Sequence, residues 1–170
     1  MIKVALTGSE STGKTELARK LGEHFNAPVS REFVREYVVG REGPLGYGDH
    51  GPIAKGQMAA EDDAIARATN LVFLDTDLVS TVVYCDHYFG RCPAWIDELA
   101  RSRRAQLYLL MTPDIPWEPD GVRDRGERRD EMHALFAAKL RALKLTYVEI
   151  GGDRDERLAR AVEAVEQLTL

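Results

Sequence analysis

Eight residues near the N-terminus have the types and the spacing of a phosphate-binding loop. The run Gly8-Ser9-Glu10-Ser11-Thr12-Gly13-Lys14-Thr15 fits the pattern G-x-x-x-x-G-K-[ST] and separates an apolar run from an amphipathic one. Its glycines allow the backbone to turn successive N–H groups toward one anion, which the positive end of the next helix also faces. Lys14 can reach the β- and γ-phosphates, and the Thr15 hydroxyl can ligate Mg²⁺. Residues 8–15 are therefore expected to bind ATP with Mg²⁺, while the preference for ATP over GTP stays open.

The loop is predicted to end at Thr15. A second threonine, at position 16, would offer another hydroxyl, but that position holds Glu16. No role in cofactor binding is therefore assigned to position 16.

Two aspartates follow a second apolar run, at residues 71–74. Ligands bind at the carboxyl ends of the strands in open parallel sheets, so Asp75 is predicted to hold Mg²⁺ with Thr15, directly or through water. Asp77 is predicted to act in catalysis or substrate binding, because two carboxylates this close favour a cation or a hydroxyl between them. The alternative for Asp77 is a helix N-cap, since the chain from Leu78 onward has a helical pattern.

Four arginines gather just before a predicted helix. They are Arg123, Arg125, Arg128 and Arg129. Phosphoryl transfer spreads negative charge over the transferred group, and an arginine that closes over it stabilises the transition state while excluding water. The segment is therefore predicted to be a catalytic lid, with Arg123 and Arg128 as the catalytic arginines. The alternative is a solvated turn in which the arginines pair with the acidic residues interleaved among them.

The periodicity of the chain predicts the elements that must position these residues. Short apolar runs predict five strands, at residues 2–6, about 28–33, 71–74, 107–111 and 146–150. Amphipathic stretches predict helices at 14–25, about 52–69, 78–88, 94–103, about 129–143 and a last one through Leu158 and Leu168. The glycine-rich stretch 40–56 is expected to be a loop over the substrate site. This alternation predicts an α/β fold, a doubly wound five-stranded parallel sheet flanked by helices.

Length and charge bound the class of protein. A chain of 170 residues suits one domain, 1–170, and a net charge of −5 argues against nucleic acid as a partner. No apolar run is long enough for a membrane span and no secretory signal is visible, so we expect a cytoplasmic protein without a membrane partner. Cys85 and Cys92 lack the spacing of a zinc or disulfide motif. Whether the protein forms a homo-oligomer stays open.

Together these features resemble the ribosylnicotinamide kinase (nicotinamide riboside kinase) domain of the bacterial NAD-biosynthesis regulators. Besides the loop, the matching stretches are Glu32 with Arg35-Glu36, residues 53–57, residues 75–77, and residues 116–117 followed by 120–123. The resemblance implies MgATP-dependent phosphorylation of the ribose 5′-hydroxyl of nicotinamide riboside, giving nicotinamide mononucleotide for NAD synthesis. In the regulators this domain follows a DNA-binding and an adenylyltransferase domain. Because the first predicted strand follows directly after Met1 here, a stand-alone kinase is expected.

Several residues are candidates for the substrate side of such a kinase. Glu32, and also Glu36, lies just beyond the second strand, where a carboxylate could accept the proton of the attacking hydroxyl, although a solvated helix start is the alternative. Asp49 could bond ribose hydroxyls or balance a cationic ring, or simply form a turn. The aromatic candidates for stacking on that ring are Tyr84, Tyr88, Trp95 and Trp117, of which Trp117 is favoured. The four histidines, including His50, are expected at the surface.

Two other functions stay open. A kinase of similar plan could act on another nucleoside or metabolite, and the sequence separates these substrates poorly. A nucleotide-binding regulatory switch would hydrolyse ATP to control a partner, but the predicted arginine lid favours an enzyme that keeps water away from the γ-phosphate. The proton acceptor is also unsettled, since Glu32, Glu36 and Asp77 are all candidates.

Overall fold

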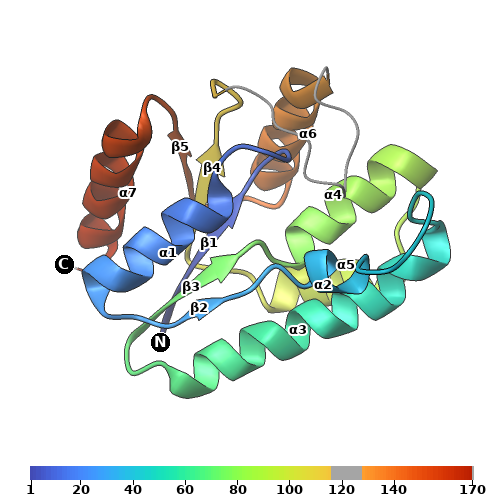
Figure 1. Ribbon diagram of the computed structural model, residues 1–170, viewed down its shortest axis with the longest axis horizontal. Coiled ribbons are helices and arrows are strands. Elements are labelled where there is room, and N and C mark those ends of the chain that lie inside the picture. The colour runs from blue at the N-terminus through green and yellow to red at the C-terminus, as the bar shows by residue number, and fades with distance from the viewer. Residues whose placement is uncertain (116–127, 170) are drawn as a thin grey trace.

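The centre of the molecule is a parallel β-sheet (Figure 1). The computed structural model describes residues 1–115 and 128–169, and within them the strands are β1 (Ile2–Thr7), β2 (Val29–Ser30), β3 (Leu71–Asp75), β4 (Leu107–Met111) and β5 (Tyr147–Ile150). The five strands lie in the order β2-β3-β1-β4-β5, and every neighbouring pair is parallel. The predicted fold class, a doubly wound five-stranded parallel sheet, is confirmed.

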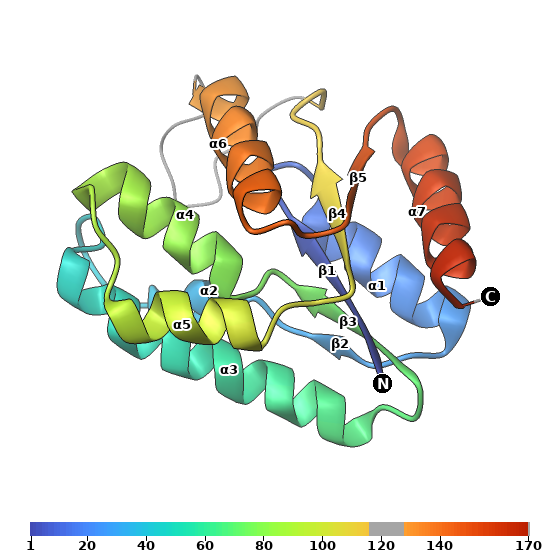
Figure 2. The same ribbon diagram turned by 180° about the vertical axis from the view of Figure 1, so that it is seen from behind.

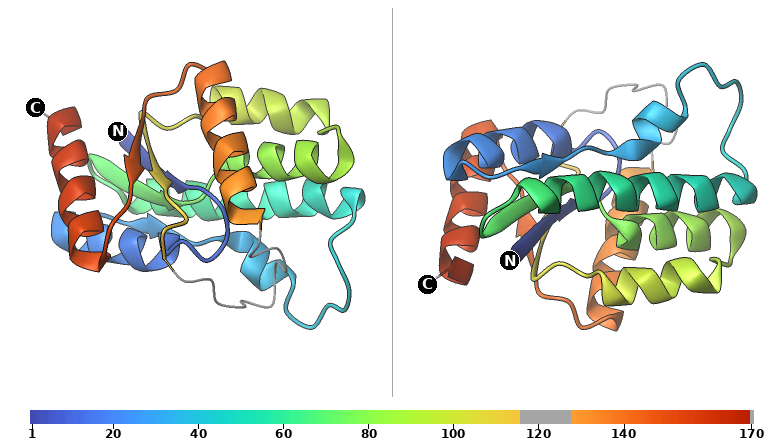
Figure 3. Two further views of the ribbon diagram at one scale, coloured as in Figure 1. Left: turned by 90° about the horizontal axis from the view of Figure 1, so that it is seen from above. Right: turned by 90° about the horizontal axis from the view of Figure 1, so that it is seen from below.

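Helices cover both faces of this sheet. The described helices are α1 (Lys14–Phe25), α2 (Phe33–Tyr37), the 3₁₀ turn η1 (Tyr47–Asp49), α3 (His50–Arg67), α4 (Leu78–Phe89), α5 (Ala94–Ser102), α6 (Arg129–Ala142) and α7 (Arg154–Thr169). The helices α1 and α7 pack on one face, whereas α3, α4, α5 and α6 belong to the layer on the other face (Figures 2 and 3). None of the helices in the described part of the chain is long and apolar enough to span a bilayer.

The two layers explain why the strands read as continuous apolar runs. Val4 and Leu6 of β1 lie in the core with α1 and α7, while Ala5 between them lies in the core with α3 to α6. Successive side chains of a strand point to opposite faces, and here both faces are covered, so all three residues are fully buried. Burial of this apolar surface on both sides holds the central strands in place.

The carboxyl ends of the central strands meet at one edge of the sheet. In the parallel register Leu6 pairs with Asp75 and Thr7 pairs with Leu110, so β1, β3 and β4 end side by side. The chain leaves β1 toward α1 on one face and leaves β3 toward α4 on the other. Such a reversal opens a crevice at the strand ends, which is where ligands bind in sheets of this kind.

The region between β2 and β3 differs most from the sequence expectation. Residues 33–37 and 47–49 form short helices, and α3 begins at His50, so the predicted loop over 40–56 ends early. Pro52 lies in the first turn of α3, where its missing N–H has no intrahelical partner to lose, and it therefore does not delay the helix start. Strand β2 has only two residues, fewer than the six predicted.

Candidate active site

Strand β1 delivers the phosphate-binding loop to the edge where the strands end, and α1 begins at Lys14. Gly8 and Gly13 have φ angles of 130° and 81°, in the region that residues with a Cβ rarely adopt. A Cβ on Gly8 would also lie 2.9 Å from the Met111 carbonyl oxygen of β4. The Thr12 hydroxyl donates to the Ser9 carbonyl over 2.9 Å and closes the loop on itself. Both glycines of the motif are thus required by local geometry.

Lys14 lies across this loop with its side chain buried. Its Nζ donates to the Ser9 carbonyl at 2.7 Å and to the Gly8 carbonyl at 3.2 Å. An ammonium in this position stands at the start of α1, beside the N–H groups that have no partner within the helix. The arrangement concentrates positive charge where the motif predicts phosphate binding.

Thr15 and Asp75 meet as the sequence predicts. The Thr15 hydroxyl donates to Asp75 Oδ2 over 2.7 Å, and Asp75 Oδ1 is buried without a hydrogen-bond partner among the described residues. Burial, followed by the charge of Glu32, raises the pKa of Asp75 to about 6, against the opposing effects of Thr15 and Lys14. A buried carboxylate with an unused oxygen beside a second carboxylate and a hydroxyl is a set of oxygens that suits a divalent cation.

The residue after Thr15 differs from it in both type and surroundings. Position 16 holds Glu16 and no threonine, so it has no hydroxyl to add to the site. The Glu16 side chain is 40% exposed, and its carboxylate lies 3.7 Å from Lys20 Nζ and 3.5 Å from Arg154 Nε. It therefore belongs to the solvated surface of α1.

The few protein oxygens around Thr15 and Asp75 suit Mg²⁺ better than a metal ion that is held by protein ligands alone. In the described ranges, no three His, Cys, Asp or Glu side chains are grouped so as to hold a metal ion. Mg²⁺ usually keeps several waters and binds through one or two protein oxygens together with substrate phosphates. Thr15 and Asp75 are the residues that could hold it here.

Two arginines from distant parts of the chain bind the carbonyls of the phosphate-binding loop. Arg129, the first residue of α6, donates from NH1 to the Ser11 carbonyl at 3.3 Å, and its buried Nε has no partner among the described residues. Arg157 of α7 donates from NH1 to the Thr12 carbonyl at 2.7 Å. These contacts join the loop to the helices that follow β4 and β5.

The structure corrects the choice between the lid arginines. Arg128 has a side chain that is 55% exposed, and its Nε lies 3.9 Å from Glu131, so it is not brought to the phosphate-binding loop. Arg129 is brought to the loop instead, because the side chains of successive residues at a helix start project in different directions and only one of the two can face the site. Arg123 and Trp117, the other predicted site residues in this region, lie outside the described residues.

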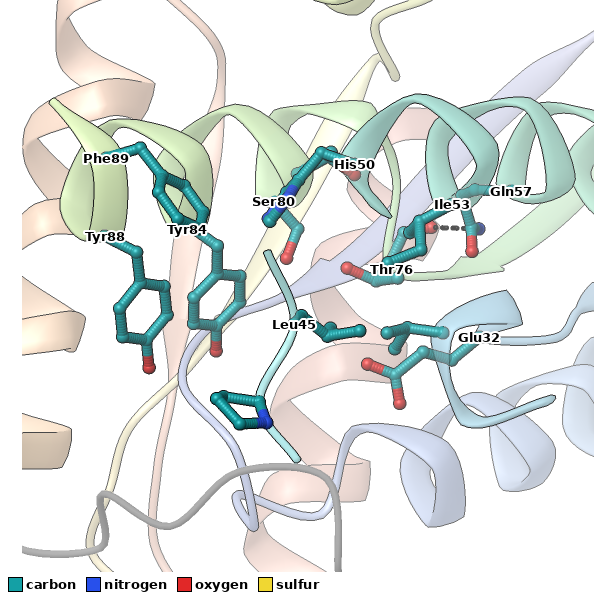
Figure 4. A pocket seen from close by; sticks show the side chains of 13 residues that line it. Glu32, Leu45, His50, Ile53, Gln57, Thr76, Ser80, Tyr84, Tyr88 and Phe89 are labelled. Carbon is teal, nitrogen blue, oxygen red and sulfur yellow. Dashed lines mark hydrogen bonds between the residues drawn. The ribbon is translucent and has the colours of Figure 1, made fainter. Parts of the chain in front are cut away.

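A cavity of about 320 Å³ lies next to the phosphate site. Its walls come from α2, α3, α4 and the segment before η1, and most of the lining is apolar or aromatic. Figure 4 shows Tyr84, Tyr88 and Phe89 of α4 at one side of the pocket and Glu32 at the other. The rings of Tyr84 and Tyr88 are stacked with their centroids 6.2 Å apart. The shape and lining suit a flat ring system that is held near the loop.

Glu32 connects the cavity to the phosphate site. Its carboxylate is 2% exposed, accepts from Arg35 Nε at 2.7 Å, lines the cavity and acts on the pKa of Asp75. Glu32 is the N-cap of α2, whereas Glu36 lies within that helix, and its exposed carboxylate pairs with Arg31 and lines the open groove beside α1. Of these two carboxylates, the structure therefore brings Glu32 and not Glu36 to the junction of the cavity and the loop.

Asp77 and Asp49 serve the fold in this structure. Asp77 accepts from the Val79 N–H at 3.0 Å as the N-cap of α4, and from the Tyr108 hydroxyl at 2.7 Å. Its carboxylate is buried against these donors and does not line the cavity, so the structure favours the N-cap that the sequence left as the alternative.

Asp49 likewise fits its alternative as a turn residue. It accepts from the Gly46 N–H, the Tyr37 hydroxyl and Arg41, all at 2.7 Å, and it does not line the cavity. Its contacts hold the turn that precedes α3 rather than a ligand site.

Sequence reasoning missed or undervalued several cavity residues. His50 is only 5% exposed and lines the cavity, so the expectation of a surface histidine is wrong. Gln57 bridges the site: its Nε2 donates to the Thr76 carbonyl at 3.3 Å and its Oε1 accepts from the Phe33 N–H at 3.0 Å. The matching stretch 53–57 was a signal for Gln57, whereas no local pattern pointed to His50. Trp117 was favoured over Tyr84 and Tyr88, although both tyrosines line the cavity.

A parallel sheet in this strand order, with a glycine loop between β1 and α1, defines a P-loop nucleotide-binding protein. The chain belongs to the AAA domain family, which matches residues 3–157. It is 34% identical over 172 residues to the trifunctional NAD biosynthesis/regulator protein NadR of Escherichia coli strain K12. This match covers 97% of the chain and 42% of NadR, so the chain spans less than half the length of that relative.

Solved structures support the same relationship. A crystal structure of NadR protein in complex with NR is 30% identical with a TM-score of 0.80, and the match covers 98% of this chain and 51% of that one. NadR in complex with NAD and AMP-PNP is 28% identical with a TM-score of 0.76, over 98% of this chain and 49% of that one. The resemblance predicted from the sequence is therefore confirmed. A thymidylate kinase from Ehrlichia chaffeensis, at 13% identity and a TM-score of 0.70 over 96% of this chain and 98% of that one, shows that the fold is shared with nucleotide kinases.

Proposed function

We propose that residues 1–170 act as an ATP-dependent kinase domain that phosphorylates the ribose 5′-hydroxyl of nicotinamide riboside and gives nicotinamide mononucleotide. The observation that carries this proposal is the junction of an aromatic cavity with the phosphate-binding loop at Glu32. The cavity supplies a place for a nucleoside beside the place for the γ-phosphate. The likeness to NadR, which has been crystallised with NR, supports the choice of substrate.

Each reactant has its own group of residues in this proposal. The loop 8–15 binds the phosphates of ATP, and Lys14 offers its ammonium to the β- and γ-phosphates. Thr15 and Asp75 would hold Mg²⁺, which would supply positive charge to stabilise the phosphates. Arg129 reaches the loop from α6 and adds charge where the transferred group becomes more negative.

Glu32 is the proposed proton acceptor. The acceptor's 5′-hydroxyl would lie at the Glu32 end of the cavity, where a carboxylate within hydrogen-bond reach can take its proton. The hydroxyl oxygen then bonds to the γ-phosphorus as the bond from that phosphorus to the β–γ bridging oxygen breaks and ADP leaves. The cationic pyridinium ring would lie at the other end against Tyr88, whose ring face attracts a cation. This arrangement would orient the hydroxyl toward the γ-phosphate, so that the hydroxyl and not water attacks the phosphate.

The test is ATP consumption by the purified protein with Mg²⁺ and a panel of nucleosides that includes nicotinamide riboside, with product masses measured in parallel. A gain of one phosphate on nicotinamide riboside, much faster than on other nucleosides, is expected. Transfer to a different nucleoside would keep the kinase and replace the substrate. Steady ATP hydrolysis without a phosphorylated product would overturn the proposal in favour of a regulatory ATPase.

A further inference from the structure

His50 is the buried ionisable residue of the cavity for which the proposed mechanism has no role. It is the first residue of α3, and Figure 4 shows its side chain among the residues that surround the pocket. Its Nδ1 lies 3.1 Å from the Gly46 carbonyl oxygen, and its ring meets Phe89 edge to face with centroids 5.3 Å apart. These two contacts fix the orientation of the ring.

The contact with Gly46 determines which nitrogen carries the proton. A carbonyl oxygen can only accept a hydrogen bond, so Nδ1 must be the donor. In the neutral ring, Nε2 is then an acceptor, and it offers a lone pair rather than a proton. A ring that is 5% exposed and lines the cavity presents this lone pair to a ligand more readily than to bulk water.

The ends of the cavity indicate which part of a nucleoside would meet His50. Glu32 marks the end that faces the phosphate site, so the sugar hydroxyl belongs there. Phe89, which contacts His50, and Tyr88 mark the end for the base, whereas the hydroxyl of Tyr84, 3.4 Å from Glu10 Oε2, reaches the phosphate-binding loop. His50 is therefore placed to meet a substituent of the base and not the reacting hydroxyl.

The charge of the lining decides what that substituent can be. Among the described residues that line the cavity there is no lysine or arginine, and Glu32 is the only carboxylate. A carboxylate on the base would be buried without a cationic partner from these residues, which is costly, whereas a neutral carboxamide carries N–H donors that suit an acceptor nitrogen. We propose that His50 is a specificity-determining residue that accepts a hydrogen bond at Nε2 from the carboxamide of the base and disfavours the carboxylate analogue. This inference rests on the proposed kinase function.

Two substitutions separate recognition from a structural role. In His50→Asn the amide nitrogen lies nearly at the position of Nδ1 and can keep the bond to Gly46, whereas in His50→Gln the amide reaches nearly the position of Nε2, where its oxygen can accept the N–H of the carboxamide. The readout is the ratio of kcat/KM for nicotinamide riboside to kcat/KM for nicotinic acid riboside. His24→Asn, a change at an exposed histidine of α1, is the matched control.

We expect the wild-type protein and the control to prefer the carboxamide substrate by at least about tenfold, the effect of roughly one hydrogen bond. His50→Gln should stay within about threefold of the wild-type ratio, while His50→Asn should lower it about tenfold. The opposite order, with Asn near wild type and Gln impaired, would show that only the bond to Gly46 matters and would overturn the inference. Thermal unfolding of each variant shows whether a loss of activity is a loss of fold.

The wild-type result alone separates this inference from the function it rests on. Phosphorylation of neither riboside, with turnover of another nucleoside or none, would refute the proposed substrate. Phosphorylation of both ribosides with equal kcat/KM would leave the proposed function standing and refute the role of His50.

Discussion

Replacing Arg157 by methionine should weaken both the fold and the phosphate-binding loop. The side chain is 5% exposed and makes a set of contacts that joins three segments of the chain. NH1 donates to the Thr12 carbonyl at 2.7 Å, Nε to the Gly152 carbonyl at 2.8 Å and NH2 to the Thr112 carbonyl at 3.0 Å. NH2 also pairs with the carboxylate of Asp114. Methionine fills much of the same space but donates none of these bonds.

The expected loss follows from these contacts. Hydrogen bonds from a charged donor contribute about 1.5 to 3 kcal/mol each, and removal of one partner from a buried ion pair costs about 3 to 5 kcal/mol. Asp114 is 44% exposed, so water can solvate its carboxylate once the guanidinium is gone. We therefore expect the lower end of that range, about 3 kcal/mol. For a domain of this size such a loss lowers Tm by roughly 9 °C.

Equilibrium unfolding in urea measures this change directly, and the KM for ATP reports its effect on the loop. Arg160→Met is the matched control, because Arg160 is an exposed arginine on the same helix, α7. We expect the control to stay within about 0.5 kcal/mol of wild type. A loss below about 1 kcal/mol in Arg157→Met would refute the reasoning, because it would mean that water replaces the arginine at all three carbonyls. An unchanged KM for ATP would refute the link between Thr12 and the loop's function.

Three further predictions concern the loop and a buried carboxylate. Lys14→Ala should abolish phosphoryl transfer while circular dichroism shows an intact fold, because Lys14 acts on the transition state more than on the core; equal activity would refute the P-loop mechanism. Arg129→Ala should lower kcat by at least about tenfold and Arg128→Ala by less than twofold, since only Arg129 reaches the loop, and similar values for the two would contradict this assignment. Burial, followed by the charge of Asp77, raises the pKa of Glu61 from 4.5 to about 7, despite Arg103 and Lys3 nearby. The folded state therefore holds the proton more tightly than the unfolded state, and this group's stabilising contribution is lost as the pH rises from about 4.5 to 7, by about 3 kcal/mol. Glu61→Gln should remove that part of the pH dependence in urea unfolding, and an unchanged slope would show that Glu61 stays charged in the fold.

The phosphate site was predictable because it is local in the sequence. The glycines of residues 8–15 and the helix start that follows them are contiguous, so the sequence shows the anion site even though distant arginines also bind the loop. Asp75 was predictable for a related reason: it ends an apolar run, and parallel strands place their ends at one edge. The sheet itself followed from the alternation of buried runs and amphipathic helices.

The acceptor side was less predictable because it is assembled from residues with no local pattern in common. Asp77 has the same residue type and nearly the same position as Asp75, yet the start of α4 and the Tyr108 hydroxyl take up its oxygens. Arg128 and Arg129 are adjacent, and only the direction in which each leaves the helix distinguishes them.

The sequence by itself determined the nucleotide site and the alternation of the strands with the longer helices, because these depend on contiguous residues and on periodicity. Only the tertiary structure decided that His50 and Glu32 line one cavity with α4, and that Arg129 and Arg157 hold the loop. The physical reason is that side-chain direction, burial and hydrogen-bond partners depend on how the helices pack on the sheet. Segments far apart in the chain then contribute residues to one site, and these residues have no regular spacing in the sequence that would predict it.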